Sequence, residues 1–202
     1  NEITKKKDAV RRCASEGFEC EKIAIEKIKH FVSKEAFNID GFGKKIVENF
    51  WKIKLIKLPH DIFKLDYEKI KKLEGWGKLS VSNLKYSIDS KRSISLDKFI
   101  YSLGIRHIGL ENAKLISKYY KSFSRFKNLS QNKKFSELLN IDGIGETQVN
   151  SIKHFFSNQT NINVLDQLEE ILNIKNTAEI NKNGKFKDKT FMITGKLNGI
   201  SR

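Results

Sequence analysis

Four short glycine-containing segments recur along the 202-residue chain, and their residue types suit the binding of a phosphate group. Each segment lies between two stretches of helical patterning and ends in a glycine. The final glycines are 34, 32 and 36 residues apart, which is too regular for unrelated turns. We therefore interpret the segments as one structural unit used four times. They are IDGFG (39–43), LEGWG (73–77), IRHIG (105–109) and IDGIG (141–145).

The glycines give these segments their capacity to hold an anion. Glycine adopts positive φ in a tight hairpin and, because it lacks Cβ, lets another backbone approach closely. A helix is expected directly after each final glycine. Its unpaired N–H groups and the positive end of its dipole would then face the open side of the hairpin, which we call the hairpin mouth. The middle apolar residues are expected to pack between the two helices of each unit; they are Phe42, Trp76, Ile108 and Ile144.

The charges beside the hairpins make the four copies unequal. Lysines follow the first two hairpins, whereas Asp142 lies inside the fourth and Glu146 follows it. In the third, His107 replaces the first glycine, so we expect an altered hairpin in which Arg106 and His107 add phosphate contacts. The residues predicted to contact the phosphates of a partner are Gly41, Gly43, Lys44, Lys45, Gly75, Gly77, Lys78, Arg106, His107, Gly109, Gly143, Gly145 and Thr147.

Net charge supports a polyanionic partner. Lys plus Arg number 39 against 24 Asp plus Glu, which gives a net charge of +15 and a pI near 9.7. No apolar run approaches the roughly 18 residues that a membrane span requires, and no signal peptide is evident, so we expect a soluble cytoplasmic protein. Because the first residue is Asn1, without an apolar leader, we expect the chain to begin inside a longer one.

The spacing of apolar residues predicts a mainly α fold, with one proline in the chain, Pro59. The stretch 173–189 is rich in Asn and Lys and is predicted to be a linker, and 190–194 (TFMIT) is predicted to be a strand without a partner. The predicted helices are Glu21–Ser33, one after Gly43, Tyr67–Leu73, Ser80–Ser90, Leu96–Leu103, Leu110–Tyr120, Phe135–Leu139, Thr147–Ser157 and Val164–Leu172.

Cys13 and Cys20 could form half of a structural zinc site, which normally takes four ligands. Two reduced thiols or a disulfide would account for the same pair. His30, His60 and His154 are expected to be surface or hydrogen-bonded histidines and not metal ligands.

The glycine segments resemble the helix-hairpin-helix motif, which grips a DNA phosphate without reading sequence. Such units commonly pair about a pseudo-twofold axis and meet both strands across the minor groove, so repeat one is expected to pair with two, and three with four. Two alternatives to DNA binding stay open. An isolated Gly-x-Gly is also an ordinary helix end followed by a helix start, and a helical protein-interaction scaffold could use such hairpins only as tight connectors.

The order of these features is similar to that of bacterial NAD-dependent DNA ligases. The resemblance implies the second half of a Cys₄ zinc finger at 1–20, a helix-hairpin-helix domain at 21–172, the linker at 173–189 and the truncated start of a BRCT domain at 190–202. A module of another DNA-processing protein would account for the repeats but not for the flanking parts. The resemblance rests on the cysteine pair, HFVS (30–33), NIDGFG (38–43), SLGIRHIG (102–109), LNIDGIG (139–145) and FKDKTFMITGKLNGISR (186–202).

The resemblance also implies the chemistry of a longer parent. In that family a Lys-x-Asp-Gly lysine takes AMP from NAD, and Mg²⁺ assists the sealing of nicks in replication and repair. This chain has no such tetrapeptide, so we assign it no catalytic residue and expect the fragment to be inactive. Its expected partners are duplex DNA, especially nicked DNA, and the other domains of the ligase. Cys13 and Cys20 would bind zinc in the parent, although their six-residue separation exceeds the family's usual spacing, and we expect no tightly bound cofactor in the fragment.

Overall fold

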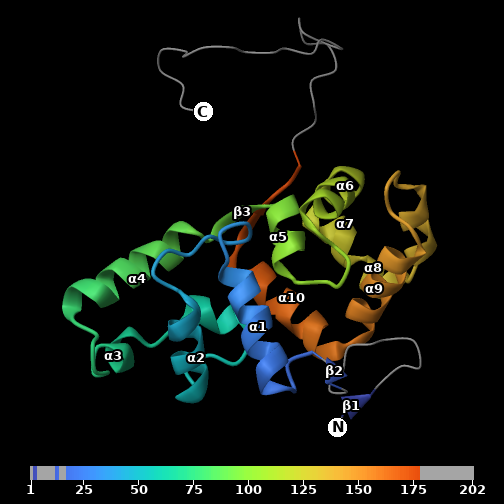
Figure 1. The fold of residues 1–202 in the computed structure, drawn as a ribbon. Coiled ribbons are helices and arrows are strands. Elements are labelled where there is room, and N and C mark those ends of the chain that lie inside the picture. The colour runs from blue at the N-terminus through green and yellow to red at the C-terminus, as the bar shows by residue number, and fades with distance from the viewer. Residues whose placement is uncertain (1, 4–11, 14–16, 178–202) are drawn as a thin grey trace, which may run out of the picture.

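Each glycine-containing segment connects two helical elements, as the sequence predicts (Figure 1). The computed structural model describes residues 2–3, 12–13 and 17–177. The helices that follow the segments are α2 (Lys44–Lys52), α4 (Lys78–Ser90), α6 (Leu110–Tyr120) and α9 (Glu146–Ser157). The elements that precede them are α1 (Glu21–Val32), α3 (Tyr67–Ile70), α5 (Leu96–Ser102) and the 3-10 helix η2 (Phe135–Asn140).

The helix α2 shows how apolar spacing creates these elements. Val47, Phe50 and Trp51 recur at helical intervals, and all three are buried, so one face of α2 enters the core while its lysines stay outside. The predicted bounds of α6 are confirmed. The structure moves the starts of α4 and α9 to the residue directly after the preceding glycine, since lysine and glutamate there continue the helix.

Several short elements join the repeats. The 3-10 helix η1 (Pro59–Lys64), which was not predicted, begins at the single proline, where a missing N–H costs nothing. The carboxylate of Asp61 accepts hydrogen bonds from the backbone N–H groups of Lys57 and Leu58, both at 2.8 Å, and holds the start of this turn. The remaining helices are α7 (Phe123–Lys127), α8 (Leu129–Asn132) and α10 (Gln159–Ile171).

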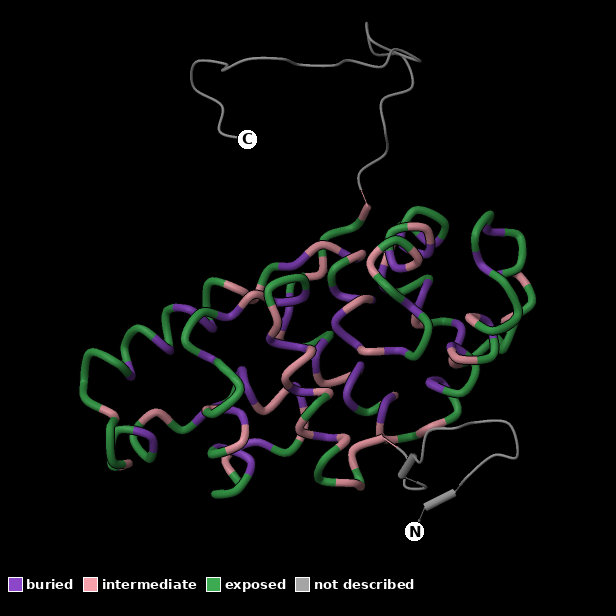
Figure 2. The backbone as a smooth tube through the Cα atoms, viewed as in Figure 1, coloured by how far each residue is buried: buried purple, intermediate pink, exposed green. Residues whose placement is uncertain are grey.

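One apolar core runs through all four repeats. Figure 2 shows buried residues along the inner side of each helix, with exposed residues on the outer side. Rings fill much of the core, as where Phe31 stacks on Phe37 with 4.3 Å between centroids. The last helix, α10, packs on both α9 and η1, and Lys64 Nζ donates to Gln167 Oε1 at 2.6 Å. The end of the described chain thus returns to the first pair of repeats.

The predicted linker was wrong at its start. Asn173–Lys175 forms the strand β4, which pairs in parallel with β3 (Ser93–Ser95), and Ile174 packs against the core. The Thr177 backbone N–H also donates to the Lys121 carbonyl at 2.9 Å. The Asn- and Lys-rich composition concealed this pairing, because the partner strand lies far away in sequence and only one side chain of β4 packs inward.

Both ends predicted to belong to neighbouring domains lie largely outside the described residues. At the N-terminus, β1 (Glu2–Ile3) pairs antiparallel with β2 (Arg12–Cys13). The TFMIT strand, the rest of the linker and the predicted BRCT start fall within 178–202, outside the described residues, and stay predictions. Among the described residues, no helix is both long enough and apolar enough to cross a membrane.

Candidate nucleic-acid interface

The four hairpins share one backbone conformation. In each, the N–H of the fourth residue donates to the carbonyl of the first, with N···O distances of 3.0–3.3 Å. The third residue has positive φ, as a tight turn of this kind requires: 77° at Gly41, 80° at Gly75, 62° at His107 and 87° at Gly143. The first and fourth residues of each turn are buried or half-buried, so packing holds the turn against the helices.

The final glycine of each segment has a different role from the first. Gly43, Gly77, Gly109 and Gly145 are the N-caps of the following helices and have extended backbone with negative φ. A side chain at any of the first three would have no atom within 4 Å of its Cβ. The backbone there is exposed, and the first N–H groups of each helix have no partner within the helix. An anion can therefore approach these helix starts directly.

The prediction of an altered third hairpin was wrong. His107 adopts the same left-handed backbone as the glycines at the equivalent positions, and the turn hydrogen bond is retained at 3.0 Å. Left-handed backbone costs a non-glycine residue about 1–2 kcal/mol. The Asn112 side-chain amide, in the first turn of α6, donates to the His107 carbonyl at 3.0 Å and supports this conformation. Arg106, His107 and Gly109 are all exposed at the mouth.

The fourth hairpin differs in what occupies its mouth. The Gly145 N–H donates to Gln148 Oε1 at 3.2 Å, so the helix start is capped by its own chain. A Cβ at Gly143 would lie 3.1 Å from Leu115 Cδ1 of α6. Asp142 and Glu146 are exposed beside this mouth and place negative charge there. The fourth hairpin is thus the least suited of the four to receive a phosphate.

Lysines surround the first two mouths. Lys44, Lys45 and Lys78 are exposed in the first turns of α2 and α4. The charged side chains that line a hollow of about 360 Å³ at the first hairpin, beside both of its glycines, are those of Lys29, Lys34, Lys44 and one acid, Asp40.

Lys29 is already engaged in this hollow. Its Nζ donates to Glu48 Oε1 at 2.8 Å and to Glu26 Oε1 at 2.7 Å. The hydrogen bond from Lys29 lowers the pKa of the Glu48 carboxyl, so the pair is ionised at neutral pH and ties α1 to α2. Lys29 thus positions the hairpin, while Lys34 and Lys44 present charge to the hollow.

Repeat one contacts repeat two, and repeat three contacts repeat four, in agreement with the predicted pairing. The Trp76 ring of the second hairpin lies 5.5 Å from that of Phe50 in α2, which joins repeats one and two. Leu115 of α6 approaches Gly143, which joins repeats three and four.

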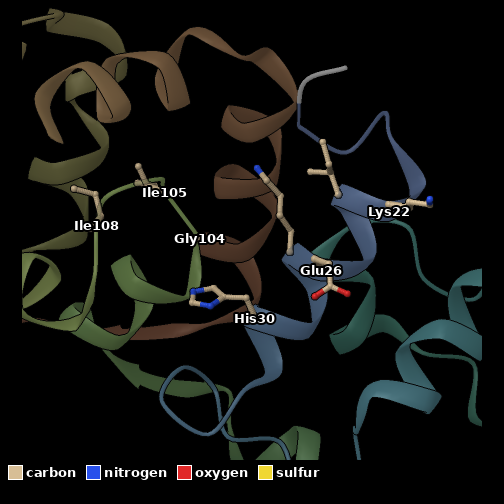
Figure 3. A pocket seen from close by; sticks show the side chains of 8 residues that line it. Lys22, Glu26, His30, Gly104, Ile105 and Ile108 are labelled. Carbon is tan, nitrogen blue, oxygen red and sulfur yellow. The ribbon is translucent and has the colours of Figure 1, made fainter. Parts of the chain in front are cut away.

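His30 has a structural role, as the sequence led us to expect. Figure 3 shows its ring reaching from α1 toward the loop that carries Gly104, at a hollow of about 520 Å³. Its Nε2 lies 2.7 Å from the Tyr101 carbonyl oxygen, and its Cδ2 would be 3.3 Å from a Cβ at Gly104. Gly104 has φ of 61°, so this position suits glycine in both conformation and space. The contact fixes the third hairpin relative to α1.

The predicted metal ligands lie at the edge of the described residues. Cys20 is half-buried at the N-cap of α1, and Cys13 lies in β2. No group of three or more His, Cys, Asp or Glu residues is placed to hold a metal ion within the described ranges. His60 has a carboxylate neighbour, with Nε2 3.4 Å from Asp61 Oδ1, and burial lowers its pKa. The described residues do not by themselves make a zinc site.

Two functional details escaped the prediction from sequence. Asn112 and Gln148 occupy the same place, three residues after the final glycine, but one supports a hairpin carbonyl and the other occupies a glycine N–H. Asparagine and glutamine near a helix start are known to compete for backbone groups, which was the available signal. Which backbone group each would bind depended on the packed hairpin.

Comparison with known proteins agrees with this geometry. The family model described as "Helix-hairpin-helix motif" matches residues 98–165, which contain the third and fourth hairpins. The chain is 69% identical over 202 residues to a protein named DNA ligase from Pelagibacter ubique (strain HTCC1062), covering all of this chain and 30% of that protein.

More distant relatives carry the same name. The chain is 42% identical over 201 residues to the DNA ligase of Wolbachia pipientis wMel and 38% over 207 residues to that of Rickettsia bellii (strain RML369-C). Each match covers 96% of this chain and 30% of the relative, so the chain spans less than a third of the proteins it matches. With a helix-hairpin-helix fold and this identity along its whole length, the chain belongs to the bacterial DNA ligase family, as a C-terminal part of such a ligase.

Proposed function

We propose that this chain binds duplex DNA through its phosphate backbone, without reading base sequence. The observation that carries the proposal is the set of open mouths at the first three hairpins, where exposed backbone leads directly into a helix start. Phosphate oxygens accept hydrogen bonds from such N–H groups and are favoured by the helix dipole. Since every nucleotide carries the same phosphate, such contacts position a duplex but carry no sequence information.

The first two hairpins are proposed as the strongest phosphate sites. Lys44, Lys45 and Lys78 add charge to these mouths, and Arg106 does so at the third. The contacts between hairpins one and two and between hairpins three and four support a grip on both strands across the minor groove. The contacts predicted at Gly143, Gly145 and Thr147 are proposed to contribute least to binding, because Gln148 and two carboxylates compete with a phosphate there.

The names of the relatives suggest that this binding serves DNA ligation. We propose that the chain holds DNA on either side of a nick, while catalytic domains elsewhere in the ligase use NAD and Mg²⁺ to seal it. Holding the reacting ends in place is itself a catalytic contribution, because it replaces an encounter in solution. Cys13 and Cys20 would supply two thiolates to a zinc ion, with the other ligands coming from outside the described residues. This chain is proposed to be inactive alone.

A salt titration tests the proposal. Fluorescence anisotropy with labelled intact, nicked and single-stranded DNA of several sequences would be measured at increasing salt. Three hairpins that each neutralise one or two phosphates predict a slope of log Kobs against log salt of roughly −3 to −5 on duplex DNA, with little dependence on sequence. A slope near zero, or binding confined to one sequence, would contradict the phosphate-clamp proposal, and absence of binding would favour a protein-interaction scaffold.

A further inference from the structure

Lys27 of α1 borders a hollow that lies apart from the four hairpin mouths. The hollow has a volume of about 520 Å³ and lies between α1 and the loop of the third hairpin (Figure 3). Its apolar lining comes from Ile23 of α1 and from Ile105 and Ile108, the first and fourth residues of the third hairpin turn. Lys27 therefore lies among apolar groups, at a site that is open to solvent.

The amine of Lys27 has no polar partner. Its side chain is half-buried, and within the described part of the chain no hydrogen bond or ion pair reaches its Nζ. The Phe18 ring lies beside it, with its centroid 5.0 Å from Nζ. Burial in these apolar surroundings lowers the pKa of Lys27. Near neutral pH a larger fraction of this amine is therefore unprotonated, and so nucleophilic, than of an ordinary exposed lysine.

The charged and titratable residues that line the hollow with Lys27 all belong to α1. Lys22 is exposed, and Glu26 already accepts a hydrogen bond from another lysine at 2.7 Å. The His30 ring is held at the Tyr101 carbonyl through its Nε2. The residues from other elements that line this hollow, and the small cavity on the other side of Lys27, carry no charge. The lining thus leaves the Lys27 amine without a carboxylate partner, while Lys22 favours an anion nearby.

We propose that Lys27 is a site of acylation by small acyl phosphates, with the acyl group on the apolar lining of the hollow and the phosphate attracted by Lys22. The unprotonated Nζ attacks the carbonyl carbon, an N–C bond forms, and the C–O bond to the phosphate breaks. Inorganic phosphate leaves with the electron pair, and the amine loses a proton to water. The product is a neutral amide, which removes the cost of a charge in apolar surroundings. This inference is independent of DNA binding.

Competition between two lysines of one helix tests the proposal. The full chain would be incubated with acetyl phosphate near neutral pH, and acetylation of Lys27 and Lys22 would be followed by peptide mass spectrometry. Lys22 is the matched control, because it borders the same hollow but is exposed. We expect Lys27 to be acetylated at least about threefold faster, and this ratio to fall as pH rises, because an ordinary lysine then also loses its proton. Equal or slower acetylation of Lys27 would overturn the proposal.

The variant Ile23→Glu tests whether the surroundings of Lys27 cause its reactivity. A glutamate four residues before a lysine on a helix pairs with it and favours the ammonium form, so acetylation of Lys27 should fall to the rate of Lys22 or below. Unfolding of the unsubstituted chain in urea should also abolish the difference between the two lysines, and this measurement does not depend on the folding of the variant. Faster acetylation of Lys27 that persists in urea would contradict a role for the hollow.

Discussion

The first two hairpins and the fourth have the same backbone conformation but differ in whether an anion can reach their glycines and helix starts. Gly43 and Gly77 open onto empty space beside lysines, whereas the Gly145 N–H is bound to Gln148 and lies beside Glu146. Gly41 likewise faces open space, but Gly143 lies against Leu115. One sequence pattern thus specifies the turn in both places, while the surroundings decide whether an anion can reach it. Repeated motifs within one domain need not repeat their function.

Blocking the open mouths should have the largest effect on DNA binding. In Gly43→Leu/Gly77→Leu, both positions have negative φ and open space, so the fold should persist while the side chains obstruct phosphate. Charged-group hydrogen bonds contribute about 1.5–3 kcal/mol each, so losing two sites should weaken binding by more than about 100-fold, as measured by anisotropy. The same change at Gly145 is the control and should leave affinity within about twofold. A comparable loss in Gly145→Leu would show that the fourth hairpin is equally used.

Charge changes should have the next largest effect. Replacing Lys44, Lys45 and Lys78 with alanine should reduce the salt-dependence slope by about 2–3, since each lost phosphate contact contributes about 0.9. The reverse change at the fourth hairpin, Glu146→Lys, should leave the slope unaltered if that mouth stays away from DNA. A steeper slope in Glu146→Lys would show that the fourth hairpin lies within reach of the duplex.

Gly41 and Gly143, the first glycines of the first and fourth hairpins, allow a comparison of stability. Both Gly41→Ala and Gly143→Ala impose positive φ on alanine, which should cost about 1–2 kcal/mol in the free energy of unfolding. Gly143→Ala should cost more, because the new methyl group meets Leu115 at 3.1 Å while Gly41 has open space. Urea denaturation of the two variants measures this difference. Equal losses in the free energy of unfolding would mean that the Leu115 side chain moves away from Gly143 at no cost and does not block the fourth hairpin.

The smallest expected effect is at Gln148. In Gln148→Ala the Gly145 N–H loses its partner, and loss of a cap of this type costs about 1 kcal/mol, measured as a lower Tm. DNA affinity should not change, because Asp142 and Glu146 remain. Stronger binding in Gln148→Ala would show that the side chain alone had closed the fourth mouth.

Local features were the most predictable from sequence. The glycine segments, the helices that follow them and the burial of Phe42, Ile108 and Ile144 were all anticipated, because glycine conformation and apolar spacing act over a few residues. The third hairpin was misjudged for the same reason. His107 was expected to disturb the turn, since its local preference disfavours positive φ, but packing of the flanking residues and the Asn112 hydrogen bond outweigh it.

The sequence by itself determined that four glycine-containing hairpin turns exist, where they lie and which of them carry lysine. Those properties follow from residue types that act on their nearest neighbours along the chain. Only the tertiary structure decided which turns are open, that Asn173–Lys175 joins β3, and that Lys27 borders a hollow between α1 and the third hairpin. These depend on contacts between residues far apart in sequence, such as Leu115 with Gly143, whose meeting requires the whole core to have formed.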